Sequence, residues 1–173
     1  ANGASYMLED RGKYDYSLRL NETDGCLWVV KKAYNSDDLI SSGHILFKDG
    51  CIQIENTNAS LPQMLFDDYP IYDSIVFDVD GDGIDEVCVL GFGRTSGLFT
   101  FTFRAAEIGA DTLKYDTLFC TEWYDLSFIR GDDGVVRVQG IDQKEPPQTH
   151  LFDIAVVDGS IQLTEDGQSI SRY

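Results

Sequence analysis

Residues 75–90 read IVFDVDGDGIDEVCVL, and this stretch decides which fold the sequence predicts. Its two ends are rich in Val and Ile, the residue types that favour β-strands. Its middle contains Gly81 and Gly83, and glycine lets a chain bend sharply because it adopts positive φ at little steric cost. The stretch therefore predicts two antiparallel strands joined by a tight acidic loop.

Four further Asp-Gly pairs predict hairpins in the rest of the chain. Each pair lies between two short runs of strand-forming residues, and Asp-Gly supplies the positive φ that both centres of a type I′ turn need. These pairs are Asp24-Gly25, Asp49-Gly50, Asp133-Gly134 and Asp158-Gly159. With the strand patterns at 86–92, 98–104 and 113–121, they predict an all-β fold, which is an antiparallel meander of roughly a dozen short strands. The meander would pack as a sandwich, a barrel or a propeller-like array.

Helix is expected only as one or two short turns. The best candidate covers residues 61–67, with Ser60 as its N-cap and Pro62 near the first helical position, where the missing N–H of proline has no consequence. No linker or low-complexity tract divides the 173 residues. We therefore expect a single all-β domain over 1–173, since one core can serve a chain of this length.

The charge balance limits the partners. Thirteen Lys and Arg residues face thirty Asp and Glu residues, which gives a net charge of −17. Nucleic acids and anionic membranes bind clustered basic residues, so neither is expected as a partner. No apolar run is long enough to insert directly into a membrane. The expected ligands are cations, neutral glycans or basic protein surfaces.

The acidic loop itself predicts a metal site. Five carboxylates fall within residues 78–86, and like charges at such density repel one another unless a cation neutralises them. A D-x-D-x-D-G pattern of hard oxygen donors suits calcium. The predicted ligands are the side chains of Asp78, Asp80, Asp82 and Glu86 and the carbonyl of Ile84. The alternative is an acidic turn that binds no metal.

The spacing separates this loop from an EF-hand, because the twelfth loop position is Val89 where an EF-hand needs a bidentate Glu. Over about residues 74–92, the strand–loop–strand pattern with an acid at the ninth position resembles the calcium loops of FG-GAP and VCBS proteins. That resemblance implies the same five ligands and an outward-facing or water-binding Asp85. It also implies an exported bacterial protein in which Ca²⁺ has a structural role.

Other residues give weaker signals. The four cysteines form no C-x-x-C pair, so a zinc site is not expected, and free core thiols and two disulfides both remain open. His44 and His150 lie in separate strand patterns without a catalytic motif. The glycine-rich stretch 91–97 lacks the Lys-Ser/Thr pair of a phosphate-binding loop. A glycan-stacking platform could use a set of five aromatic residues: Trp28, Tyr69, Tyr72, Trp123 and Tyr124.

Together these observations predict an exported, non-enzymatic binding or interaction module braced by calcium. It would be secreted or at the cell surface, as a lipoprotein or extracytoplasmic sensor domain, and its ligand would be a protein or a glycan. The chain begins at Ala1, with its first Met at position 7, which fits a processed exported protein. The alternative is a secreted hydrolase, possibly directed at glycans, that uses the calcium loop only as a brace. The ligand and the oligomeric state stay open.

Overall fold

The computed structural model describes side chains at residues 61–66, 73–91, 99–121 and 125–170, and elsewhere only the backbone of strand residues. Within these residues the fold is all-β, with three antiparallel sheets and one short 3-10 helix. The prediction of an all-β antiparallel meander is confirmed, because every sheet pairs its strands in the order of the chain. No helix in the described residues is long and apolar enough to cross a membrane.

The first sheet consists of β1 (Tyr14–Leu20), β2 (Leu27–Ala33), β3 (Leu39–Lys48), β4 (Cys51–Ile54) and β5 (Ala59–Pro62). The 3-10 helix η1 (Gln63–Phe66) follows β5 directly. The middle sheet consists of β6 (Ile71–Phe77), β7 (Glu86–Phe92), β8 (Phe99–Glu107) and β9 (Tyr115–Thr121). The third consists of β10 (Tyr124–Arg130), β11 (Val136–Ile141), β12 (Thr149–Val157), β13 (Ser160–Glu165) and β14 (Gln168–Ser169).

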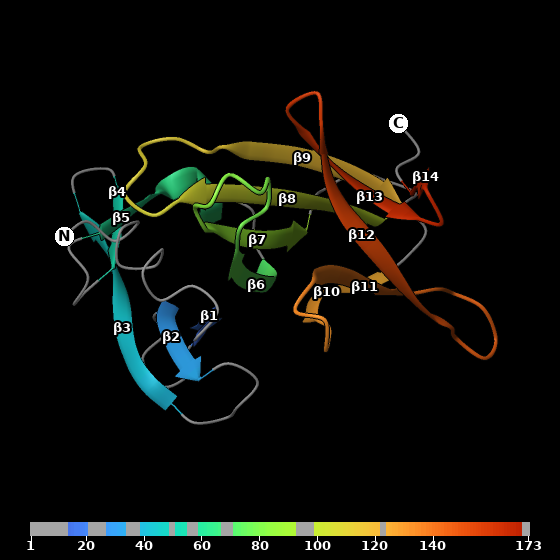
Figure 1. Cartoon of the computed structure of the whole chain (residues 1–173), viewed down its shortest axis with the longest axis horizontal. Coiled ribbons are helices and arrows are strands. Elements are labelled where there is room, and N and C mark those ends of the chain that lie inside the picture. Colours follow the sequence, from blue (N-terminus) through green and yellow to red (C-terminus); the bar gives the residue numbers. More distant parts are fainter. Residues whose placement is uncertain are drawn as a thin grey trace.

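The three sheets meet at β6. This strand lies beside β1 of the first sheet and β10 of the third, so the first strands of all three meanders are neighbours. Figure 1 shows the blue-to-cyan and orange-to-red sheets on different sides of the green-to-yellow middle sheet. Each meander has the strand order of a propeller blade. Among the described strands no sheet closes on itself, so the barrel is not the architecture found here.

Several of the predicted hairpins are found. Asp158 and Gly159 have φ of +49° and +76° between the paired Val157 and Ser160, as a type I′ turn requires. Lys48 pairs with Cys51, which leaves a two-residue connection at the second predicted pair. Strands β1 and β2 pair as predicted, although the connection at 21–26 lies outside the described residues.

One further Asp-Gly hairpin was not predicted. Asp166 and Gly167 have φ of +51° and +79°, and they connect the paired Glu165 and Gln168 at the start of β14. The same dipeptide signal was present in the sequence, but β14 has only two residues and shows no strand pattern of its own.

Two further predictions were right about the element and wrong about its detail: β10 and β11 form the predicted hairpin, and η1 lies within the predicted helical range 61–67. At Asp133-Gly134 only Gly134 has positive φ, because the connection from Arg130 to Val136 is five residues long and closes through a Gly134 N–H to Gly131 carbonyl bond of 2.9 Å. Pro62 does not begin a helix. It is the last residue of β5 and pairs with Cys51, so η1 starts one residue later and Ser60 lies in the strand instead of capping it.

The middle and third sheets share one core. Its buried side chains come from both sheets: Cys88, Leu90, Phe101, Phe103, Ala105, Tyr115, Phe119, Leu126, Val138, Phe152, Ile161 and Leu163. Phe103 of β8 meets Phe128 of β10 edge to face, with ring centroids 5.6 Å apart. Cys88 and Cys120 are buried free thiols. Burial in this core, together with the charges of Glu86 and Asp85, raises the pKa of the Cys88 thiol.

Replacing Phe103 with Ala should lower the free energy of unfolding by about 3–5 kcal/mol, because it removes a buried ring from the contact between two sheets. The matched control is Leu118→Ala, an exposed residue of β9, which should change it by less than about 0.5 kcal/mol. Urea unfolding monitored by circular dichroism measures both. Equal effects of the two substitutions would contradict a shared core at Phe103.

Candidate metal centre

The acidic loop spans the turn between β6 and β7, the hairpin at which the three sheets meet. Phe77 pairs with Glu86, so the two strands hold the loop at both ends. Gly81 and Gly83 have φ of +76° and +94°. Open space surrounds both glycines, so an added side chain would be disfavoured by backbone strain and not by collision.

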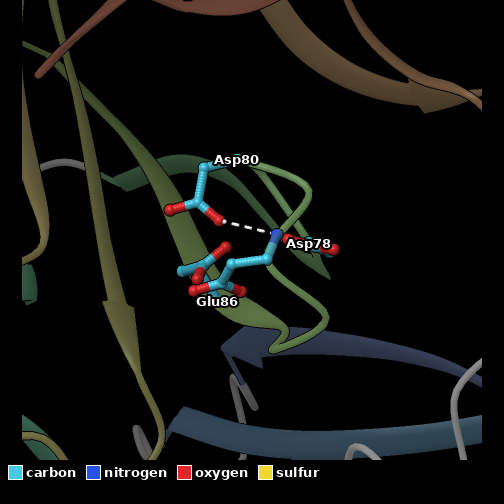
Figure 2. A group of neighbouring side chains, drawn as sticks. Asp78, Asp80 and Glu86 are labelled. Atoms are coloured by element: carbon cyan, nitrogen blue, oxygen red, sulfur yellow. Dashed lines mark hydrogen bonds between the residues drawn. The ribbon is translucent and has the colours of Figure 1, made fainter. Parts of the chain in front are cut away.

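Four carboxylates converge inside this loop. Asp78, Asp80, Asp82 and Glu86 each offer one oxygen, and these four oxygens lie within 4.8 Å of one another. Figure 2 shows Asp78, Asp80 and Glu86 gathered beside the loop. Glu86 is the innermost of the four, with none of its surface exposed. The sequence therefore predicted a group of acidic side chains that the fold does bring together.

The backbone of the loop turns its N–H groups toward these carboxylates. Asp78 accepts hydrogen bonds from the N–H groups of Gly81 and Gly83 at 2.9 and 3.0 Å. Ile84 N–H donates to Asp82 at 2.8 Å, and Val79 N–H donates to Glu86 at 2.8 Å. The side chains are thus held in place before any ligand arrives. A metal-binding role for the Ile84 carbonyl stays a prediction.

A lysine from another hairpin reaches into the same cluster. The Nζ of Lys114, at the end of the β8–β9 connection, lies 2.8 Å from Asp80, 2.9 Å from Asp82 and 3.1 Å from Glu86. It also lies 2.9 Å from Glu107 at the end of β8. One ammonium therefore contacts carboxylates from the loop, from β7 and from β8.

The neighbouring Tyr115 adds a direct hydrogen bond. Its hydroxyl donates to Asp80 at 2.6 Å. Burial, this bond and the charge of Asp80 raise the pKa of Tyr115 to about 12.

The surroundings of Asp80 and Glu86 shift the pKa values of these two carboxyl groups in opposite directions. Burial opposes ionisation of Asp80, but hydrogen bonds from Lys114, Tyr115 and the Asp82 N–H outweigh it and lower the pKa of Asp80 to about 2. Burial raises the pKa of Glu86 to about 7, although the Val79 N–H and Lys114 act against it. Burial disfavours the charged form of Lys114, but its bonds to Asp80, Asp82, Glu107 and Glu86 outweigh this and raise its pKa.

The four carboxylates fit a calcium ion. Calcium binds oxygen at about 2.3–2.6 Å, so ligands on opposite sides of one ion lie about 4.6–5.2 Å apart. The 4.8 Å spread of the four oxygens falls in that range. All four donors are hard oxygens, which calcium prefers and softer metals do not. The same cluster is thus able to hold a metal ion, and the Lys114 ammonium lies among its oxygens.

Lys114, Tyr115 and Glu107 were not found from the sequence. They follow the loop by more than twenty residues, and no motif connects them to it. The signal was in the strand register, because Glu107 pairs directly with Glu86. Two like charges opposite each other on paired strands are destabilising unless a cation lies between them.

The other predicted candidates contribute no site within the described residues. His150 lies between two carboxylates, with Nδ1 2.8 Å from Glu165 and Nε2 3.0 Å from Asp142. Its two nitrogens face opposite partners, so the three residues do not converge on one point as metal ligands would. The side chains of the remaining candidates lie outside the described residues: Trp28, His44, Tyr69, Tyr72, Trp123 and Tyr124.

The His150 cluster ties the β11–β12 connection to the end of β13. Burial opposes the charge of Asp142, but hydrogen bonds from His150 and from the N–H groups of Gln148 and Lys144 lower the pKa of Asp142 to about 2. The bond to Asp142 raises the pKa of His150; burial acts against it and Glu165 adds to it. The Lys144 ammonium also faces Asp142, at 3.7 Å.

The cluster predicts a pH-dependent stability. Because the pKa of His150 is higher in the folded state than in the unfolded chain, its stabilising contribution is complete below about pH 6.5 and is lost as the pH rises through the folded value. The excess free energy of unfolding of the wild type over His150→Gln should therefore be largest near pH 5–6 and shrink above. Urea unfolding at several pH values measures it. If the excess free energy of unfolding does not change with pH, a charged His150 does not stabilise the fold.

No family model, curated protein or solved structure matches the chain. The resemblance of the loop to FG-GAP and VCBS proteins therefore stays a prediction from about twenty residues.

Proposed function

We propose that this chain is an exported, non-enzymatic binding or interaction module in which Ca²⁺ braces the β6–β7 hairpin. The observation that carries the proposal is the convergence of four carboxylate oxygens within 4.8 Å on that hairpin. Asp78, Asp80, Asp82 and Glu86 are the proposed side-chain ligands, with the Ile84 carbonyl as a fifth. The proposed role of the ion is structural.

The position of the loop explains why a brace there is useful. Strand β6 lies between β1 and β10, so the hairpin that contains the loop connects the middle sheet to both others. The group contains five acidic side chains once Glu107 is included, and within the residues whose side chains are described the Lys114 ammonium contacts four of them. A divalent cation would offset the remaining repulsion at the point that joins the sheets.

The expected calcium affinity supports the proposed location outside the cell, and the net charge supports the proposed class of ligand. Loops of this kind in extracellular modules bind calcium with dissociation constants of about 10⁻⁴–10⁻³ M, which suits a calcium-rich exterior. The net charge of −17 supports a basic protein surface or a neutral glycan as the binding partner and disfavours nucleic acid. A secreted, lipoprotein or sensor-domain setting remains part of the proposal.

A hydrolase is the rival function, and one observation favours it. Asp80 and Glu86 have pKa values of about 2 and 7, and such a separation is typical of an acid–base pair. However, Glu86 has no exposed surface and is held by the Val79 N–H and by Lys114. A general acid must contact its substrate, so this carboxyl fits a buried ligand better than a catalytic group.

Calcium at about 10 mM should raise the free energy of unfolding by about 1.4–2.7 kcal/mol and the melting temperature by a few degrees, because the ion binds only the folded state. Asp80→Asn should abolish most of this shift, since it removes one charged ligand. Differential scanning fluorimetry with calcium and with EGTA measures both variants.

The matched control is Asp153→Asn, which removes an exposed carboxylate of β12 paired with Arg137. It should keep the full calcium shift. Melting curves of the wild type that coincide in calcium and in EGTA would remove the metal from the proposed function.

A further inference from the structure

The ammonium of Lys114 contacts four carboxylates in and beside the acidic loop. The Nζ of Lys114 donates to Asp82 at 2.9 Å, to Glu86 at 3.1 Å and to Glu107 at 2.9 Å, and it lies 2.8 Å from Asp80. An ammonium has three hydrogens, so all of its donors are committed to carboxylates. Only 26% of the Lys114 side chain is exposed.

The ammonium and a metal ion would share three of the same carboxylates. Lys114 contacts Asp80 Oδ2, Asp82 Oδ2 and Glu86 Oε1, which belong to three of the four carboxylates that converge in the loop. A calcium ion on those carboxylates would lie at about 2.3–2.6 Å from their oxygens, in the space that the ammonium fills. Two cations at such a separation repel each other strongly, so binding of one excludes the other.

The backbone keeps this ammonium close to the loop. The N–H of Lys114 donates to the Ala105 carbonyl at 2.8 Å, and the next residue, Tyr115, donates to Asp80. The lysine is thus a tethered competitor with a high effective concentration at the cluster. Glu107 lies on the same hairpin, belongs to no predicted ligand set and contacts Nζ at 2.9 Å. It offers the ammonium a partner outside the loop.

We infer that Lys114 is the resident cation of the acidic loop, and that a divalent cation binds there only by displacing its ammonium toward Glu107. The inference rests on the proposed calcium brace for its second half. Lys114 then sets the metal affinity of the loop. If the ammonium fills the loop in 90–99% of molecules, the apparent dissociation constant for calcium is raised roughly 10- to 100-fold.

The first test removes the competitor with Lys114→Met, which keeps most of the length of the side chain without its charge. In EGTA this variant should melt several degrees below the wild type, because its carboxylates have lost their counter-charge. Isothermal titration with calcium chloride should show binding roughly 10- to 100-fold tighter than in the wild type. Lys144→Met is the matched control, since Lys144 is 64% exposed, and it should change neither value.

The second test uses the wild type and needs no variant. Amine labelling followed by mass spectrometry should modify Lys114 slowly in EGTA and faster in millimolar calcium, when the ammonium leaves the loop. Lys144 serves as the internal reference and should react at the same rate in both conditions. This measurement can still contradict the inference if Lys114→Met does not fold.

The outcomes separate this inference from the proposed function. If the wild type and Lys114→Met bind calcium equally well, and Lys114 labelling does not respond to calcium, the inference is wrong and the brace stands. If only Lys114→Met binds calcium, Lys114 is the resident cation as inferred, but the native ammonium is not displaced, which overturns both the calcium brace and the second half of the inference. If neither protein binds calcium, both are wrong.

Discussion

Repulsion among the carboxylates of the β6–β7 hairpin is the constraint on which the arrangement of this protein depends. Asp80, Asp82 and Glu86 lie close enough to bind one ion, and Glu86 is buried, so its charge cannot be screened by water. Such a group of charges is stable only with a cation among them. The fold supplies the Lys114 ammonium, and the same carboxylates could hold a metal ion.

The constraint matters because of where the hairpin lies. Strand β6 is the neighbour of both β1 and β10, and the middle and third sheets share a core of buried aromatic and aliphatic side chains. A change in the loop would therefore act on β6, which lies near the centre of Figure 1 beside β1 and β10. The proposed cation binding would therefore be linked to the packing of the sheets through one strand, which supports the proposed structural role over a catalytic one.

Most of the fold could be predicted from local signals. The limits of β7 (Glu86–Phe92) agree with the predicted strand, and the Asp158-Gly159 turn has the predicted geometry, because both depend on neighbouring residues alone. The errors occurred where the length of a connection or pairing with a neighbouring strand outweighed the local sequence signal. The five-residue connection replaced the type I′ turn at Asp133, and pairing with Cys51 kept Pro62 in a strand.

The sequence by itself determined that the chain is all-β and that an acidic loop with Asp78, Asp80, Asp82 and Glu86 joins two strands, because alternation, turn residues and charge density are properties of adjacent residues. Only the tertiary structure decided what lies opposite the loop. Lys114, Tyr115 and Glu107 reach it through the register of β7, β8 and β9. Register depends on the packing of the whole sheet. No short motif could therefore have predicted that the Lys114 ammonium lies among the carboxylates.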